Sequence, residues 1–228
     1  MIKQVRRSEI FAEFFGSIFL VMAAISSMIM FAEVFESGKE IAVLANAISV
    51  GFVLCVLIEM FAPVSGAHFN PVVTLVMLLD KKITAKKAAI FVLFQFLGGI
   101  IGAAFSHLMF FDTVESIFAV SDNVRDGYTY LGEIFGSFIL VLAILMLVQA
   151  GSKKISLLIG FLVGGQLLAT SSTMFANPQV TIARMLSPTA SGIRPEDAAI
   201  FIIMQIIGAS LAYFTYRFFF QHKNKVGT

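Results

Sequence analysis

The chain has 228 residues, which suits one or two domains. Hydrophobic residues make up 58% of it and charged residues 13%, whereas a soluble domain carries roughly 25% charged residues. This composition excludes a disordered chain, a nucleic-acid binder and a disulfide scaffold, and it predicts an integral membrane protein. The net charge of +2 is too small to indicate a polyanionic partner. The single cysteine, Cys55, is interpreted as a small packed side chain.

Uncharged runs predict the membrane spans in chain order, since a spanning helix needs about 20 mostly apolar residues. The first run follows basic residues, but it is long enough to span and has no clear cleavage site. We therefore expect an uncleaved first helix rather than a signal peptide. The runs that suit one spanning helix each are 14–32, 41–58, 88–111, 134–152 and 198–216.

Two further uncharged runs do not fit a single spanning helix. Residues 60–79 contain Pro63, Gly66 and Pro71, which disfavour a continuous lipid-facing helix. Residues 155–183 are longer than one span, and their second half is rich in Thr and Ser. We therefore expect a sixth spanning helix at the start of 155–183 and one re-entrant segment in each half of the chain.

The distribution of basic residues supports six spans and two re-entrant segments. With this count, twelve Lys or Arg residues fall on one side of the membrane and four on the other. The side with twelve, together with both termini, is predicted to be cytoplasmic. The twelve are Lys3, Arg6, Arg7, Lys81, Lys82, Lys86, Lys87, Lys153, Lys154, Arg217, Lys223 and Lys225, and the four are Lys39, Arg125, Arg184 and Arg194.

The two halves of the chain repeat each other, over residues of about 8–111 and 128–220. Each half contains three spans, which is an odd number, so the halves must lie in opposite orientations. Inverted repeats of this kind place the transport site near the midplane of the membrane. The predicted fold is one all-α channel domain, 1–228, with six transmembrane helices and two re-entrant half-helices in an inverted repeat. The matching segments are 13–21 with 133–141, Asn70-Pro71 with Asn177-Pro178, and Gln95 with Gln205.

Each Asn-Pro pair predicts the start of a helix. Proline fits the first helical position because it has no N–H to leave unbonded, and the preceding Asn70 or Asn177 is a favourable N-cap. Inverted symmetry would bring both N-termini together, each with a charge of about +0.5 from the helix dipole. The side-chain N–H groups of Asn70 and Asn177 would then favour neutral hydrogen-bonding solutes, and the helix ends would repel protons and cations.

On these residues the chain resembles the aquaporin, or major intrinsic protein, family over essentially its whole length. The resemblance implies one pore per subunit and usually a homotetramer. It also implies that Glu13 and Glu133 hold the backbones of the re-entrant loops by hydrogen bonds. The residues that carry it are Glu13, Glu133, Gln95, Gln205, Ser65-Gly66-Ala67-His68-Phe69-Asn70-Pro71-Val72 and Asn177-Pro178-Gln179.

The chain departs from the family's usual pattern and is similar to atypical bacterial members without the filter arginine. The usual Asn-Pro-Ala boxes are changed to Asn-Pro-Val by Val72 and to Asn-Pro-Gln by Gln179. Val180 stands where water-selective members have an arginine directly after the second box.

The resemblance also implies the other filter positions. They are Val50, Met174 and, on the fifth spanning helix, either Gly165 or Gln166, because counting back and aligning the helix pattern differ by one residue. Such a filter is wide and apolar. It favours glycerol-like polyols, urea or undissociated metalloid acids over strict water selection.

The sequence leaves two interpretations open for each of several ionisable residues near the predicted pore. Arg184 lies about two helical turns, or roughly 10 Å, after the second box. It either replaces the missing filter arginine at the outer mouth or binds loop carbonyls, Glu196 or Asp197. His68 should face the cytoplasmic vestibule, as a structural hydrogen-bonding group or as a pH gate. Glu59 is either a loop anchor or a vestibule charge.

The sequence thus predicts a passive channel for water and small neutral solutes in an inner or plasma membrane. The channel is expected to contact membrane lipid and to bind no cofactor, metal or nucleic acid. An enzyme is not expected, because no metal-spaced cluster, phosphate loop or nucleophile motif is present. The alternative is a proton- or ion-coupled carrier that uses Glu13, Glu59 or Glu133. Carrier transport would saturate and follow a pH gradient, whereas channel flux would be linear in solute concentration.

Overall fold

A computed structural model describes residues 5–221 of the chain, and this part of it is helical without any strand. Long helices alternate with short ones, and a π-helical segment, η1 (Ile29–Val34), extends the first helix. The long helices are α1 (Arg7–Met28), α2 (Lys39–Phe61), α4 (Ala85–Met109), α6 (Tyr128–Gln149), α7 (Ile155–Ala169) and α9 (Pro195–Gln221). The short ones are α3 (Pro71–Leu79), α5 (Phe111–Val114) and α8 (Pro178–Met185).

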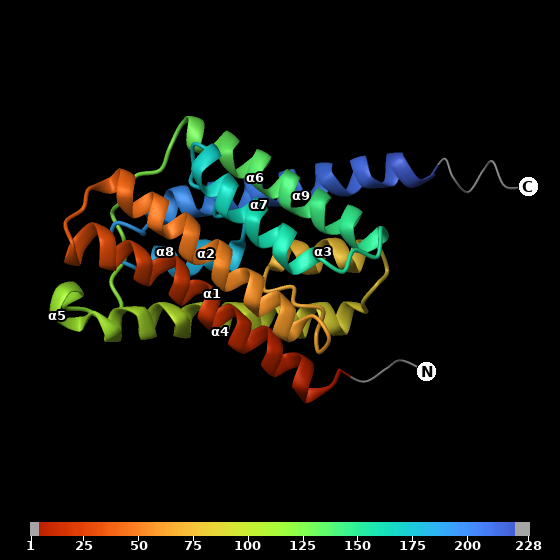
Figure 1. The fold of residues 1–228 in the computed structure, drawn as a ribbon, viewed down its shortest axis with the longest axis horizontal. Helices are drawn as coiled ribbons and strands as arrows, with labels where there is room; N and C mark the ends of the chain where they lie inside the picture. Colours follow the sequence, from red (N-terminus) through yellow and green to blue (C-terminus); the bar gives the residue numbers. More distant parts are fainter. Residues whose placement is uncertain (1–4, 222–228) are drawn as a thin grey trace, which may run out of the picture.

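The long helices run along the long axis of the molecule, with α3 and α8 packed among them (Figure 1). In the first half α1 packs on α4, in the second half α6 packs on α9, and α2 packs on α7 across the halves. The start of α1 and the end of α9 lie toward one end of the molecule, the terminal end, and α5 lies at the other, the α5 end (Figure 1). Half-helix α3 lies nearer the terminal end and α8 nearer the α5 end.

The lengths of the helices agree with the predicted spans. Among the described residues, five helices are long and apolar enough to cross a membrane: α1 with η1, α2, α4, α6 and α9. Helix α7 is a shorter apolar helix of 15 residues, or roughly 22 Å at 1.5 Å per residue. The run 155–183 is divided as predicted, because α7 ends at Ala169, before the Thr- and Ser-rich stretch, and α8 begins at Pro178. The prediction of six transmembrane helices and two half-helices in an inverted repeat is confirmed.

The two half-helices begin at the Asn-Pro pairs for the same local reason. Asn70 and Asn177 have extended backbones, with φ of −156° and −157°. The side-chain oxygen of each accepts the backbone N–H two residues later, at 3.0 and 3.2 Å. Pro71 and Pro178 then occupy the first helical position, where a missing N–H leaves no bond unmade. Each asparagine cap stabilises its helix by about 1 kcal/mol.

Glycines allow the long helices to pack closely. A Cβ on Gly51 of α2 would lie 2.9 Å from the carbonyl oxygen of Gly160 in α7. A Cβ on Gly98 of α4 would lie 2.5 Å from the carbonyl oxygen of Phe14 in α1. Because lipid is as apolar as a side chain, membrane helices associate through close van der Waals contact, which small residues permit. These crossings hold the bundle around the half-helices.

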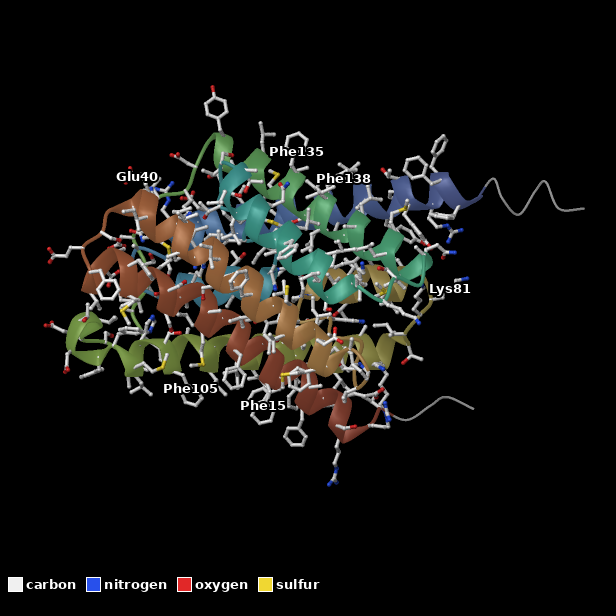
Figure 2. All side chains as sticks on the ribbon, in the orientation of Figure 1. Phe15, Glu40, Lys81, Phe105, Phe135 and Phe138 are labelled. Carbon is white, nitrogen blue, oxygen red and sulfur yellow. The ribbon has the colours of Figure 1, made fainter. Side chains whose placement is uncertain are left out.

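Apolar side chains cover the sides of the bundle. Figure 2 shows Phe15, Phe105 and Phe135 pointing away from it along its long sides, and their exposed fractions are 44%, 46% and 64%. Glu40 and Lys81 lie toward opposite ends in the same view. Apolar sides with charged ends suit a bilayer. Three basic residues used above for the orientation lie outside the described residues: Lys3, Lys223 and Lys225.

Candidate functional site

Asn70 and Asn177 connect the two re-entrant segments to each other. Nδ2 of Asn70 donates to the carbonyl oxygen of Ala176, and Nδ2 of Asn177 donates to that of Phe69, both at 2.8 Å. Both asparagines also line the central cavity. A side-chain amide carries two N–H groups. Each asparagine therefore has a second N–H that can be offered to a solute.

The residues before the two asparagines have strained backbones. Phe69 and Ala176 both have a φ of +45°, in the left-handed region that side chains disfavour. Such conformations cost about 1–3 kcal/mol each and persist only where their surroundings hold them. The backbone N–H of Phe69 donates to Glu13, and that of Ala176 donates to Glu133, both at 2.8 Å. Two carboxylates thus hold the two strained turns.

The bonds of Glu13 show how the first loop is held. Its side chain is fully buried. Oε1 accepts from Oγ of Ser65 at 2.6 Å and from the backbone N–H of His68 at 3.0 Å. Oε2 accepts from Phe69 and from Nε2 of Gln95, both at 2.8 Å. Both carboxylate oxygens are therefore engaged within the protein, and Glu13 does not line the cavity.

Glu133 makes the equivalent bonds in the second half. Oε1 accepts from the backbone N–H of Phe175 at 2.9 Å, and Oε2 accepts from Ala176 and from Nε2 of Gln205, the latter at 2.6 Å. Gln205 also donates to the hydroxyl of Thr181 at 2.9 Å. Glu133 is likewise fully buried and away from the cavity lining. The two halves thus use the same chemistry on matching residues.

A cavity of about 60 Å³ lies between α8 and the helices α1, α2, α6 and α7, with room for a small solute or a few waters. Three of the predicted filter residues, Val50, Met174 and Val180, are among its lining residues. Its polar lining residues are Asn70, Asn177 and Arg184, and the rest of its wall is apolar: Leu20, Ala24, Leu54, Leu140, Val163, Leu167, Phe175 and Ala176.

The structure differs from the sequence interpretation at the fifth spanning helix. Neither Gly165 nor Gln166 lines the cavity. Gly165 is exposed, and a Cβ added to it would meet no atom within 4 Å. Helix α7 presents Val163 and Leu167 instead, because residues four apart share a helix face. The rotation of α7 about its axis cannot be obtained by counting along the chain, because the packing of α7 on α2 determines it.

Arg184 is the charged residue of the cavity wall, with 3% of its surface exposed. Its Nη2 donates to the carbonyl oxygen of Ala24 in α1 at 3.1 Å and lies 3.5 Å from Oδ1 of Asn46 in α2. Its guanidinium carbon lies 4.2 Å from the ring centre of Phe175, a distance at which a cation is attracted to an aromatic face.

The predicted ion pair of Arg184 with Glu196 or Asp197 is absent from the described residues. Asp197 instead binds Nε of Arg194 at 2.7 Å. The guanidinium of Arg184 turns back along α8, as long side chains on a helix do, and reaches the helices α1 and α2.

Arg125 and Phe175 belong to this site, although the sequence pattern did not single them out. The guanidinium carbon of Arg125 lies 4.8 Å from the ring centre of Phe175, so that two guanidiniums share one ring. Nε of Arg125 donates to the carbonyl oxygen of Gly192 at 2.9 Å. Burial lowers the pKa of Arg125 to about 10, which leaves it cationic at neutral pH. The internal repeat could have indicated Phe175, because this residue stands two positions before the second Asn-Pro pair, as His68 does before the first.

The altered third residues of the two boxes lie in different surroundings. Val72 is buried among apolar residues of α6 and α9 and does not line the cavity. Gln179 is also buried, and its Nε2 donates to the carbonyl oxygen of Phe69 at 3.1 Å. Oε1 of Gln179 has no hydrogen-bond donor among the described residues. Gln179 therefore adds a second link between α8 and the first loop, next to that of Asn177.

Glu59 lies in the last turn of α2, and His68 lies in the loop before α3. Nδ1 of His68 is 3.0 Å from the hydroxyl oxygen of Thr74, and its ring packs edge-on against Phe91. Glu59 accepts a hydrogen bond of 2.6 Å from Oγ of Ser156 in α7. Glu59 thus binds a neighbouring spanning helix rather than the re-entrant loop.

The cavity combines apolar walls with few polar groups, which suits neutral solutes. Dissolved ions would lose their hydration shells against apolar side chains without replacement ligands. Within residues 5–221, no group of three His, Cys, Asp or Glu side chains is placed to hold a metal ion.

The chain is similar to aquaporins and aquaglyceroporins in sequence and in fold. The family model "Major intrinsic protein" matches residues 2–176. Over 211 residues the chain is 38% identical to aquaglyceroporin AqpS of Rhizobium meliloti (strain 1021), covering 92% of this chain and 89% of that protein. Over 219 residues it is 28% identical to aquaporin-4 of Rattus norvegicus, covering 92% and 66%. The X-ray structure of the aquaglyceroporin from Plasmodium falciparum shares the fold, with a TM-score of 0.70, 18% identity and coverage of 92% and 94%.

Proposed function

The chain belongs to the major intrinsic protein family, and from this premise we propose that it is a passive channel whose filter passes small neutral solutes larger than water. As a member of this family it is a membrane channel for water or small solutes and not an enzyme. The solutes we propose are glycerol-like polyols, urea and undissociated metalloid acids.

The observation that carries the proposal is the side chain of Val180 in the cavity wall. It stands directly after the second box, Asn177-Pro178-Gln179, and faces the cavity together with Val50 and Met174. A valine leaves more space than an arginine and provides no fixed charge. The wall therefore favours solutes with apolar carbon or metalloid surfaces and a few hydroxyl or amide groups, which the two asparagines can bind.

Arg184 acts in this proposal as a displaced outer cation. It borders the same cavity as Val180 and is held by Ala24 and Phe175. Its charge and the N-termini of α3 and α8 repel cations. The N–H groups of Asn70 and Asn177 would replace the water ligands that a neutral solute loses on entry.

The carrier alternative gains no support from the positions of its candidate glutamates. Glu13 and Glu133 are fully buried and bonded to loop backbone outside the cavity lining, and Glu59 is bonded to Ser156. A proton site would have to face the transport path.

We further propose a cell-membrane location with both termini cytoplasmic, because basic residues predominate on that side. The α5 end would then be extracellular. A homotetramer, typical of the family, is proposed as the assembly.

The test is stopped-flow light scattering on proteoliposomes, with water, glycerol, urea and arsenious acid as solutes. We expect glycerol or arsenious acid flux well above that of empty liposomes. The double variant Val180→Arg with Arg184→Val should lower solute flux at least tenfold while water flux persists. Val180→Ile is the matched control, since it changes volume without charge, and it should keep most of the solute flux. Water flux without any solute flux in the unmodified protein would contradict the proposal.

A further inference from the structure

We propose that the α5 end of the cavity contains a binding site for a small monovalent oxyanion, formed by the guanidiniums of Arg184 and Arg125 around Phe175. The starting observation is that Arg184 is almost completely buried and forms no ion pair within 4 Å among the described residues. Among the described residues, Nη2 is its one nitrogen that donates a hydrogen bond, and Nε is buried without an acceptor. A buried cation is costly unless it is paired and fully hydrogen-bonded.

Three carboxylates of the surrounding elements bind other groups. Glu133 accepts the backbone N–H groups of Phe175 and Ala176. Glu33 accepts the backbone N–H of Ala190 at 2.8 Å. Asp197 pairs with Arg194. The described part of the chain thus leaves two neighbouring guanidiniums without a salt bridge, and an anion from solution would provide one.

The geometry around Phe175 defines the class of anion. The two guanidinium carbons lie 4.2 and 4.8 Å from one ring centre, so they are at most 9.0 Å apart. A small anion that reaches both guanidiniums would be held by charge-assisted N–H···O bonds, which are about 2.7–2.9 Å long. Guanidiniums lie over the ring, and the ring edge carries the positive part of the aromatic quadrupole, which also attracts an anion. A planar oxyanion matches the planar donor fork of arginine.

The position of this anion site predicts an effect of the bound anion on solute transport. Arg184 borders the cavity, whereas Arg125 is not among the lining residues and binds Gly192 in the loop at the α5 end. An anion bound by Arg184 would lie against the wall of the cavity. Bound oxyanion should therefore reduce neutral solute flux. This consequence rests on the proposed channel function, but the binding itself does not.

Binding is tested first, on purified full-length protein in detergent. Thermal unfolding is measured in sodium nitrate and in sodium gluconate at equal ionic strength, since nitrate is small and planar and gluconate is bulky. We expect nitrate to raise Tm by about 2–4 °C relative to gluconate, in a saturable manner. Arg184→Gln should abolish the difference, and Arg125→Gln should weaken it. Lys39→Gln removes a positive charge from an exposed residue of the same end and should leave the difference unchanged.

Transport is tested second, as nitrate inhibition of glycerol flux in proteoliposomes. We expect at least a twofold reduction that gluconate does not produce and that Arg184→Gln abolishes. If Arg184→Gln fails to fold, Arg184→Lys keeps the charge without the planar fork and should bind nitrate at least fivefold more weakly. Equal Tm values in both salts, or a nitrate effect that persists in the folded Arg184 variants, would overturn the site. A nitrate effect on Tm in a protein without solute flux would support the site while contradicting the proposed function.

Discussion

Asn70 and Asn177 hold each other's loops: each donates at 2.8 Å to the carbonyl oxygen of the residue that precedes the other. The same side chains cap α3 and α8 through their oxygens. One amide therefore fixes both the start of its own half-helix and the position of the opposite loop. The two re-entrant segments form one reciprocal unit, although they are more than a hundred residues apart in the chain.

Replacing either asparagine should disturb both halves. Asn177→Ala removes a cap, worth about 1 kcal/mol, and a buried hydrogen bond, worth about 1 kcal/mol. We expect a lower Tm and loss of most solute flux. Asn177→Asp keeps the capping oxygen but loses the donor to Phe69, and it should lose flux as well. Flux unchanged in Asn177→Asp would mean that the cross-link is dispensable.

The buried glutamates should be sensitive to loss of their charge. Glu133→Gln replaces one acceptor oxygen by an NH₂ group, which would face the N–H groups of Phe175 or Ala176. We expect destabilisation by about 1–3 kcal/mol and reduced flux, measured by thermal unfolding and stopped flow. Glu59→Gln is the matched control, because Glu59 is exposed and Ser156 can donate to an amide oxygen. A stable, fully active Glu133→Gln protein would argue against this role.

Gln179 and Gly99 should be energetically coupled. A Cβ on Gly99 would clash with Oε1 of Gln179, so Gly99→Ala should destabilise the protein by about 1–3 kcal/mol. Gln179→Ala restores the usual third residue of the box and removes both a hydrogen bond and an unbonded oxygen, so we expect a change within about 1 kcal/mol. In the double variant much of the Gly99→Ala cost should disappear. Additive effects in this double-mutant cycle would show that the two sites are independent.

His68 should be replaceable by the residue that the second half has at the equivalent place. Phe175 packs edge-on against Phe201 with ring centres 5.3 Å apart, as His68 does against Phe91 at 5.5 Å. His68→Phe keeps this contact and loses the bond to Thr74, so Tm should fall by only a few degrees. Glycerol flux at pH 5.5 and pH 8 separates the two interpretations of His68. A pH dependence that vanishes in His68→Phe would favour a gate, and pH-independent flux in both proteins would favour a structural bond.

The membrane class, the spans and the starts of the half-helices could be predicted from the sequence. Each depends on a property of neighbouring residues: runs without charge, the missing N–H of Pro71 and Pro178, and the capping oxygens of Asn70 and Asn177. The likeness of the two halves then indicated their opposite orientation, because three spans reverse the direction of the chain. These features can be predicted without knowing which helices pack against each other.

The lining of the cavity was decided by the tertiary structure. Val163 and Leu167, rather than Gly165 or Gln166, face it, because the rotation of α7 follows from its packing on α2. Arg184 binds Ala24 and Phe175 instead of a nearby acid, and Arg125 reaches the same ring from a loop. These contacts join residues far apart in the chain. Local pattern sets where a helix begins and which residues are apolar, but the partner of a side chain depends on how helices rotate and how closely they approach.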